Sequence, residues 1–86
     1  MVTIYGKENC GFCTKAKALA DQYGIKYEYK DIGRSPADRE ELFERASVPI
    51  KSVPQIFIRK EHVGGFTQFK TYIEETGFTG GADHSL

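Results

Sequence analysis

The stretch "VTIYGKENCGFCTKAK" (Val2–Lys17) contains both cysteines of an 86-residue chain, Cys10 and Cys13. Its first residues, Val2–Tyr5, are β-branched or aromatic and predict a short buried strand. After the cysteines, apolar residues recur at intervals of three and four positions until Gly24, which is typical of an amphipathic helix that ends at a glycine. The sequence therefore predicts a strand-to-helix junction, with Cys10 at the start of the helix and Cys13 one turn inside it.

Strand and helix patterns alternate along the rest of the chain. Apolar and charged residues alternate over residues 25–32, which predicts a second strand. Ser35 as an N-cap and Pro36 at the first helical position predict a second helix, and Thr67 is the candidate cap of a third helix that Gly77 ends. The expected elements are strands at residues 2–5, 25–32, 55–58 and 62–63 and helices at residues 10–23, 36–46 and 66–76.

This βαβαββα order predicts an α/β fold with a single domain. The strand-helix-strand half requires a parallel pair of strands with a crossover, and the second half adds a hairpin and a covering helix. A four-stranded mixed sheet with helices on both faces buries every apolar stripe. We expect residues 1–77 to form the domain and residues 78–86 to form a flexible C-terminal tail.

Composition and charge argue against several classes of function. Twelve basic residues balance twelve acidic ones, so the overall field gives no reason to expect nucleic acid or an anionic membrane as a ligand. No segment approaches the roughly 20 apolar residues of a membrane span, and Met1 is followed directly by the first strand rather than by a signal peptide. We therefore expect a soluble cytoplasmic protein that binds neither nucleic acid nor membrane.

The spacing of the two cysteines favours redox chemistry. Backbone N–H groups at a helix start lack intrahelical acceptors and carry partial positive charge, which stabilises a thiolate at Cys10. Lys7 adds a full positive charge nearby. Such settings lower a cysteine pKa from about 8.5 to roughly 3.5–7.5. Cys10 is therefore the predicted nucleophile, and Cys13, on the core side of the helix, is the predicted resolving thiol that closes a disulfide with it.

Three other interpretations of the pair remain. A zinc site needs four ligands, and His62 and His84 are the remaining candidates for nitrogen donors. A structural disulfide would close a loop too short to constrain the unfolded chain much. Two inert core cysteines are a further alternative, because free cysteine is often buried. The position at a strand-to-helix junction favours the redox pair over all three.

In this order and spacing the motifs resemble those of the glutaredoxins, a branch of the thioredoxin fold, from "VTIYGKENCGFC" through "SVPQIFI" to "HVGGFTQF". The resemblance implies a thioredoxin-like fold and a Lys-x-x-Cys-x-x-Cys motif at Lys7, Cys10 and Cys13, with Phe12 as the aromatic residue before the second cysteine. It also implies a thiol-disulfide oxidoreductase that uses glutathione as a co-substrate and holds no tightly bound cofactor.

The resemblance further implies a glutathione site around a cis-proline. We assign that proline to Pro54, because "QIFI" continues directly as a strand, and we interpret Pro49 as an ordinary trans proline. A cis bond turns the backbone of Val53 outward, where an extended thiol peptide can pair with it. The start of the helix after Gly64–Gly65 suits the γ-glutamyl carboxylate of glutathione. The implied glutathione-binding residues are Lys7, Phe12, Val53, Pro54, Gly65, Phe66 and Thr67.

Three departures from the family pattern bear on this prediction. The "CGF" at residues 10–12 is typical of single-cysteine glutaredoxins that hold a [2Fe-2S] cluster with glutathione between two subunits. Thr67 and Gln68 stand where relatives often carry acidic or serine residues that hold the γ-glutamyl ammonium, so recognition of that group would depend on neutral hydrogen bonds. The loop before the assigned cis-proline is longer than usual, which leaves a further basic contact unassigned. Its candidates are Arg39, Arg45 and Lys51.

The leading hypothesis is a dithiol glutaredoxin that reduces protein disulfides and glutathione mixed disulfides through Cys10 and Cys13. Two alternatives are a dimer that binds a glutathione-ligated [2Fe-2S] cluster through Cys10 and a redoxin that is reduced by thioredoxin reductase. The expected partners are glutathione and disulfide-bearing client proteins, with ribonucleotide reductase as a client suggested only by the resemblance. The protein itself is expected to be a monomer.

Overall fold

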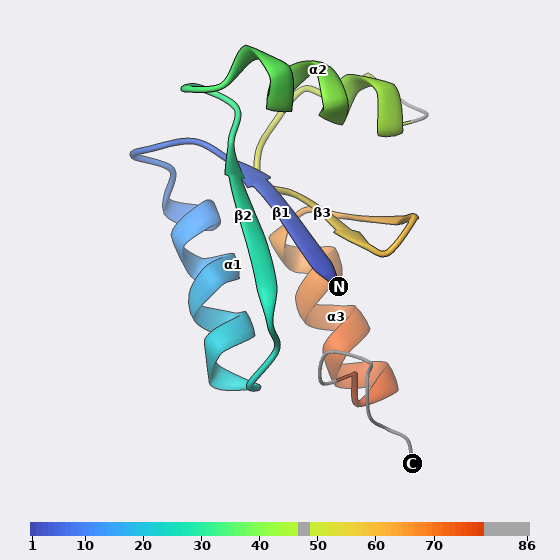
Figure 1. Ribbon diagram of the computed structural model, residues 1–86. Coiled ribbons are helices and arrows are strands. Elements are labelled where there is room, and N and C mark those ends of the chain that lie inside the picture. Colours follow the sequence, from blue (N-terminus) through green and yellow to red (C-terminus); the bar gives the residue numbers. More distant parts are fainter. Residues whose placement is uncertain (47–48, 79–86) are drawn as a thin grey trace.

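The computed structural model describes residues 1–46 and 49–78. Its elements follow the predicted βαβαββα order (Figure 1). The strands are β1 (Val2–Gly6), β2 (Tyr27–Asp31), β3 (Gln55–Ile58) and β4 (Glu61–Gly64), and the helices are α1 (Gly11–Gln22), α2 (Pro36–Arg45) and α3 (Phe66–Thr76). β3 has the predicted bounds, whereas β2 is shorter and β4 is longer than predicted.

Two local differences from the prediction have clear causes. β2 begins later because Ile25 still belongs to the turn that follows α1, where its N–H donates to Ala20 O at 2.8 Å. The prediction that Thr67 caps the last helix is wrong, because the N-cap of α3 is Gly65. Gln68, in the first turn of α3, reaches back, and its Oε1 accepts from the Gly65 N–H at 3.0 Å. A side chain at this position satisfies a backbone donor that the helix leaves free.

The strands form one mixed sheet in the order β2-β1-β3-β4. β1 runs parallel to β2 and antiparallel to β3, and β3 runs antiparallel to β4. Figure 1 shows α1 and α3 running beside the strands, whereas α2 lies apart from them at the top of the view. The predicted four-stranded mixed sheet with helices on both faces is confirmed.

The alternation of side chains along β1 and β3 divides the buried residues into two clusters. Ile4 and Ile56 belong to a large cluster with residues of α1 and α3. Tyr5 and Phe57, each one position further along, point to the opposite face and pack with Leu42 of α2. Successive residues of a strand face opposite sides of a sheet, so both faces of the two central strands are covered by helices.

A polar cluster around Tyr5 joins α2 to the sheet. Tyr5 is fully buried, and its hydroxyl donates to the Glu41 carboxylate and accepts from Arg45 Nη1 at 2.8 Å. Lys30 Nζ of β2 lies 2.6 Å from Glu41 Oε2. The hydrogen bond from Lys30 holds the pKa of Glu41 below its usual range, and burial raises the pKa of Tyr5. The cluster thus contains an ionised carboxylate that Tyr5 and Lys30 share.

We expect Tyr5→Phe to lower the free energy of unfolding by about 1–1.5 kcal/mol, because the buried hydroxyl between Glu41 and Arg45 is lost. Urea denaturation followed by circular dichroism measures the change. Tyr23→Phe is the matched control, since it removes the hydroxyl of an exposed tyrosine and should change the free energy by less than about 0.5 kcal/mol. Equal effects of the two substitutions would contradict the role of the Tyr5 hydroxyl.

His62 of β4 lies against the same side of the sheet. Its ring stacks on Phe57 with centroids 4.5 Å apart, and its Nε2 lies 2.7 Å from Gln55 Oε1. Burial is the main cause that lowers the pKa of His62, and the positive charge of the nearby Arg45 guanidinium lowers it further. Because this pKa is lower in the folded state, the unfolded chain takes up a proton first as the pH falls.

We therefore expect the contribution of His62 to stability to be complete above the unfolded-state histidine pKa of about 6.5 and to be lost as the pH falls below it, toward the lower folded-state pKa. His62→Phe keeps a ring on Phe57 that does not titrate. Its free energy of unfolding should therefore depend less on pH between about 7 and 5.5. Urea denaturation at a series of pH values measures both slopes. Identical slopes would mean that His62 does not cause the pH dependence.

Candidate active site

Cys10 and Cys13 form a disulfide across the first turn of α1, with their Cα atoms 5.2 Å apart. Cys10 is the N-cap of α1, and its Sγ accepts from the Cys13 N–H at 3.2 Å. Cys10 is half-buried, whereas Cys13 is only 1% exposed. The predicted positions of both cysteines are confirmed, and of the two residues Cys10 is the one that solvent reaches.

The loop between β1 and α1 holds Cys10 at the helix start. Asn9 takes a left-handed φ of 58°, which asparagine adopts more readily than most residues. The N–H and the hydroxyl of Thr14 both donate to Cys10 O, at 3.1 and 3.2 Å. α1, which lies wholly within the described residues, has no acidic residue in its first turn. The partial positive charge of the helix start is therefore not offset there, and it favours a thiolate at Cys10.

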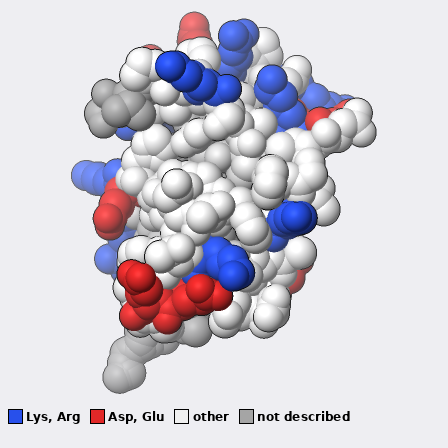
Figure 2. Space-filling view, turned by 180° about the vertical axis from the view of Figure 1, so that it is seen from behind, with Lys and Arg blue, Asp and Glu red and all other residues white. Residues whose placement is uncertain are grey.

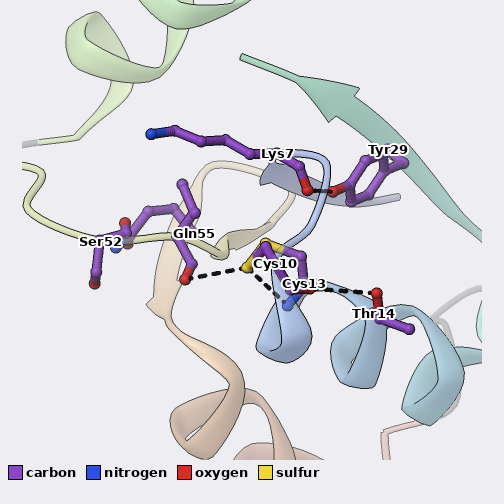
Figure 3. Close-up of a disulfide and its surroundings, with 8 residues drawn as sticks. Lys7, Cys10, Cys13, Thr14, Tyr29, Ser52 and Gln55 are labelled. Carbon is purple, nitrogen blue, oxygen red and sulfur yellow. Dashed lines mark hydrogen bonds between the residues drawn. A yellow bond between two sulfur atoms is a disulfide. The ribbon is translucent and has the colours of Figure 1, made fainter. Parts of the chain in front are cut away.

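The segment before β3 lies directly beside Cys10. The Val53–Pro54 peptide bond is cis, so the assignment of the cis-proline to Pro54 is confirmed. Val53 O lies 3.7 Å from Cys10 Sγ, and Figure 3 shows the segment that carries Ser52 and Gln55 beside Cys10. The bond between residues 48 and 49, and with it the interpretation of Pro49, lies outside the described residues.

A surface groove of about 300 Å³ begins at Phe12 and Val53, which lie close to Cys10, and extends to the start of α3. None of its lining residues is charged, so we call it the neutral groove. It is lined by Phe12, Ser52, Val53, Pro54, Gly65, Phe66, Thr67 and Gln68. The Phe12 and Phe66 rings lie 6.0 Å apart, and Phe12 is 56% exposed. The fold thus brings together all the predicted glutathione-binding residues except Lys7.

Lys7 lines a second groove of about 410 Å³, which we call the basic groove. Its lining residues are Lys7, Ile32, Gly33, Arg39, Phe43, Ile50, Lys51, Ser52 and Val53. In Figure 3 the Lys7 side chain extends away from Tyr29, on the side of the segment that carries Ser52. Figure 2 shows basic side chains gathered along the top of the rear face, above an uncharged area. The two grooves share Ser52 and Val53 and so meet beside Cys10.

The fold separates the three basic residues that the sequence left unassigned. Arg39 and Lys51 line the basic groove. Arg45 does not, because its guanidinium lies 4.3 Å from the Phe57 ring centroid and its Nη2 donates to Arg59 O at 2.5 Å. These partners are distant along the chain, and no local pattern around Arg45 indicates them.

Phe43 is a groove residue that sequence reasoning missed. Its helical spacing predicts a position on the buried face of α2, next to Leu42, but Phe43 is 47% exposed whereas Leu42 is fully buried. Leu42 fills the space against the sheet, so the neighbouring side chain is directed outward. The guanidinium of Arg39 lies 5.4 Å from the Phe43 ring centroid. The basic groove therefore combines positive charge with an aromatic wall.

Gln68 covers the start of α3. Besides its bond to the Gly65 N–H, its Cγ would lie 3.1 Å from a Cβ atom on Gly64, whose φ is 121°. A side chain at residue 64 would be strained by that φ and crowded by Gln68. Gln68, one of the residues that depart from the family pattern, thus lies at this end of the neutral groove.

Residues 1–46 and 49–78, the part of the chain that the structure describes, contain neither a metal-binding cluster nor a membrane-spanning helix. Within these ranges, no three or more side chains of His, Cys, Asp and Glu lie close enough together to hold a metal ion. In that same part of the chain, no helix is both long and apolar enough to cross a membrane. His84, a candidate zinc ligand, lies outside the described residues, and the cluster-binding alternative stays a prediction.

Comparisons with known proteins agree with this geometry. The family model described as Glutaredoxin matches residues 2–63. Glutaredoxin 1 of Escherichia coli is 35% identical over 77 residues, which span 84% of this chain and 91% of that protein. The structure of reduced E. coli glutaredoxin has a TM-score of 0.76 at 34% identity and covers 87% of this chain and 94% of its own.

A buckwheat glutaredoxin solved as a complex with glutathione has a TM-score of 0.70 at 25% identity and covers 91% of this chain and 71% of its own. The predicted thioredoxin-like fold and the resemblance to the family are both confirmed. The chain therefore belongs to the glutaredoxin family, whose members are thiol-disulfide oxidoreductases.

Proposed function

We propose that the protein is a glutathione-dependent dithiol oxidoreductase that reduces protein disulfides and glutathione mixed disulfides. The observation that carries the proposal is the asymmetry of the cysteine pair. Cys10 lies at the start of α1, within reach of solvent, and Cys13 is buried behind it at disulfide distance. A pair of this kind can alternate between a dithiol and a disulfide as a two-electron couple.

The reduced protein uses the two thiols in turn. The Cys10 thiolate attacks one sulfur of a client disulfide, and the other client sulfur leaves with the electron pair and takes up a proton. The Cys13 thiolate then attacks the Cys10 sulfur, so that the Cys10–Cys13 disulfide forms while the Cys10–client bond breaks. The client gains two electrons and two protons, and the protein is left as the disulfide seen in the structure.

Glutathione returns the protein to the dithiol. One glutathione thiolate attacks the Cys10 sulfur and releases Cys13, which takes up a proton. A second glutathione removes the glutathionyl group from Cys10, and glutathione disulfide leaves. When the substrate is itself a glutathione mixed disulfide, Cys10 accepts the glutathionyl group directly and Cys13 is not required.

Glutathione fits across the junction of the two grooves. The start of α3 offers backbone N–H groups that suit the γ-glutamyl carboxylate, and the Val53 backbone can pair with the extended peptide. Lys7, with Arg39 or Lys51, offers charge-assisted hydrogen bonds to the glycine carboxylate. The buckwheat relative, which is described as a complex with glutathione, supports this ligand.

We expect Cys10→Ser to abolish all thiol transfer and Cys13→Ser to abolish only the reduction of protein disulfides. The rate with a small glutathione mixed disulfide, measured with glutathione, glutathione reductase and NADPH, tests the first reaction. The reduction of insulin disulfides tests the second. Comparable losses of both activities in Cys13→Ser would show that the proposed division of labour between the thiols is wrong.

We also expect Gln68→Glu to lower KM for the glutathione mixed disulfide about two- to fivefold without changing kcat. A carboxylate of the same shape can still accept from the Gly65 N–H and adds an ion pair with the γ-glutamyl ammonium, of the strength typical of exposed pairs. The matched control is Thr71→Glu, which adds the same charge to α3 outside the neutral groove. A KM that is unchanged or higher in Gln68→Glu would place the γ-glutamyl group elsewhere.

A further inference from the structure

Gly6, at the end of β1, leaves room for groups from two other elements. A Cβ atom on Gly6 would overlap the Tyr29 hydroxyl and would lie 2.8 Å from Cys13 Sγ. The hydroxyl from β2 and the sulfur from α1 therefore occupy neighbouring positions over the same backbone. The redox cycle described above assigns no role to Tyr29.

The Tyr29 side chain lies near the buried sulfur and also at the protein surface. It donates to Lys7 O at 3.2 Å, in the loop before Cys10 (Figure 3). The Lys17 ammonium lies 4.2 Å from the Tyr29 ring centroid. Both side chains line a surface cleft of about 400 Å³. Tyr29 therefore approaches Cys13 Sγ and also lines a cleft that water can enter.

The resolving step needs a thiolate at Cys13. Cys13 is 1% exposed, and burial in apolar surroundings raises the pKa of a thiol. A hydrogen bond donated to the thiolate has the opposite effect. Burial is the main cause that raises the pKa of Tyr29, and the charges of Asp31 and Tyr27 raise it further. The phenol therefore keeps the proton that such a hydrogen bond requires.

We propose that Tyr29 donates the hydrogen bond that stabilises the Cys13 thiolate in the resolving step, an inference that rests on the proposed function. The Cys13 proton leaves to water in the cleft, and the Tyr29 O–H turns from Lys7 O to the Cys13 sulfur. The thiolate then forms its bond to Cys10 Sγ while the Cys10–client bond breaks. The electron pair of that bond leaves with the client sulfur, which takes up a proton from water.

Charged groups from three segments of the chain line the cleft together with Tyr29. They are Lys17 of α1, Asp31 of β2, and Lys7 and Glu8 of the loop between β1 and α1. Both reactions in the test below use Cys10, and only the reduction of protein disulfides uses Cys13. A change in the pH profile of the ratio of the two rates therefore reports Cys13.

The test compares two reactions of the Tyr29→Phe variant, which keeps the ring and lacks the donor. We expect the ratio of insulin reduction to glutathione mixed-disulfide reduction to fall about tenfold at pH 7, because the thiolate loses a hydrogen bond. The loss should shrink at higher pH, where Cys13 ionises without help. Tyr27→Phe, on the same strand, should leave the ratio unchanged. An unchanged ratio in Tyr29→Phe overturns the proposal.

A direct titration separates this role from a structural one. In a Cys10→Ser background, Cys13 is the one remaining thiol, and the ultraviolet absorbance of its thiolate against pH gives its pKa. Adding Tyr29→Phe should raise that pKa by about one unit, with an unchanged circular dichroism spectrum. An unchanged pKa overturns the role of Tyr29. If the unsubstituted protein reduces neither substrate, the proposed function fails, while the titration still decides whether Tyr29 stabilises the thiolate.

Discussion

The hydrogen bond from the Cys13 N–H to Cys10 Sγ, at 3.2 Å, fixes the position of the reactive pair. The sulfur takes the place of the oxygen that usually caps a helix, so the start of α1 and the position of Cys10 are set together. Cys13, one turn further, then points into the space that Gly6 leaves at the end of β1. One contact therefore links the start of the helix to the positions of the exposed cysteine, Cys10, and the buried one, Cys13.

The register of the sheet brings the other parts of the site to Cys10. Tyr5, near the end of β1, pairs with Gln55 at the start of β3, so Pro54 lies beside the loop that carries Cys10. Ile56 pairs with Gly64 at the end of β4. The start of α3 therefore lies at the same end of the strands as Pro54. Backbone hydrogen bonds of the sheet thus set the distances between three segments that are far apart in the sequence.

Much of this arrangement could be predicted from the sequence, because it depends on local signals. The spacing of the cysteines and the strand that follows Pro54 are examples. The remaining features depend on contacts between distant segments. Arg45 has the charge that the basic groove requires, but the Phe57 ring and a backbone carbonyl of another loop hold its guanidinium elsewhere. Tyr29 has the pattern of an ordinary strand residue, and only the fold places its hydroxyl over Gly6.

The two grooves differ in charge, and under the proposed function this difference orients the ligand, an anionic thiol. Side-chain cations attract a carboxylate over several ångströms, whereas the N–H groups of a helix start bind it only at hydrogen-bonding distance. Because Gln68 already accepts from the Gly65 N–H, the neutral groove has fewer free donors at its end. In the proposed complex with glutathione, which has a carboxylate at each end, the basic groove therefore holds the ligand first. The grooves meet at Val53, beside Cys10, so the proposed position of the ligand brings the sulfur in its middle to Cys10.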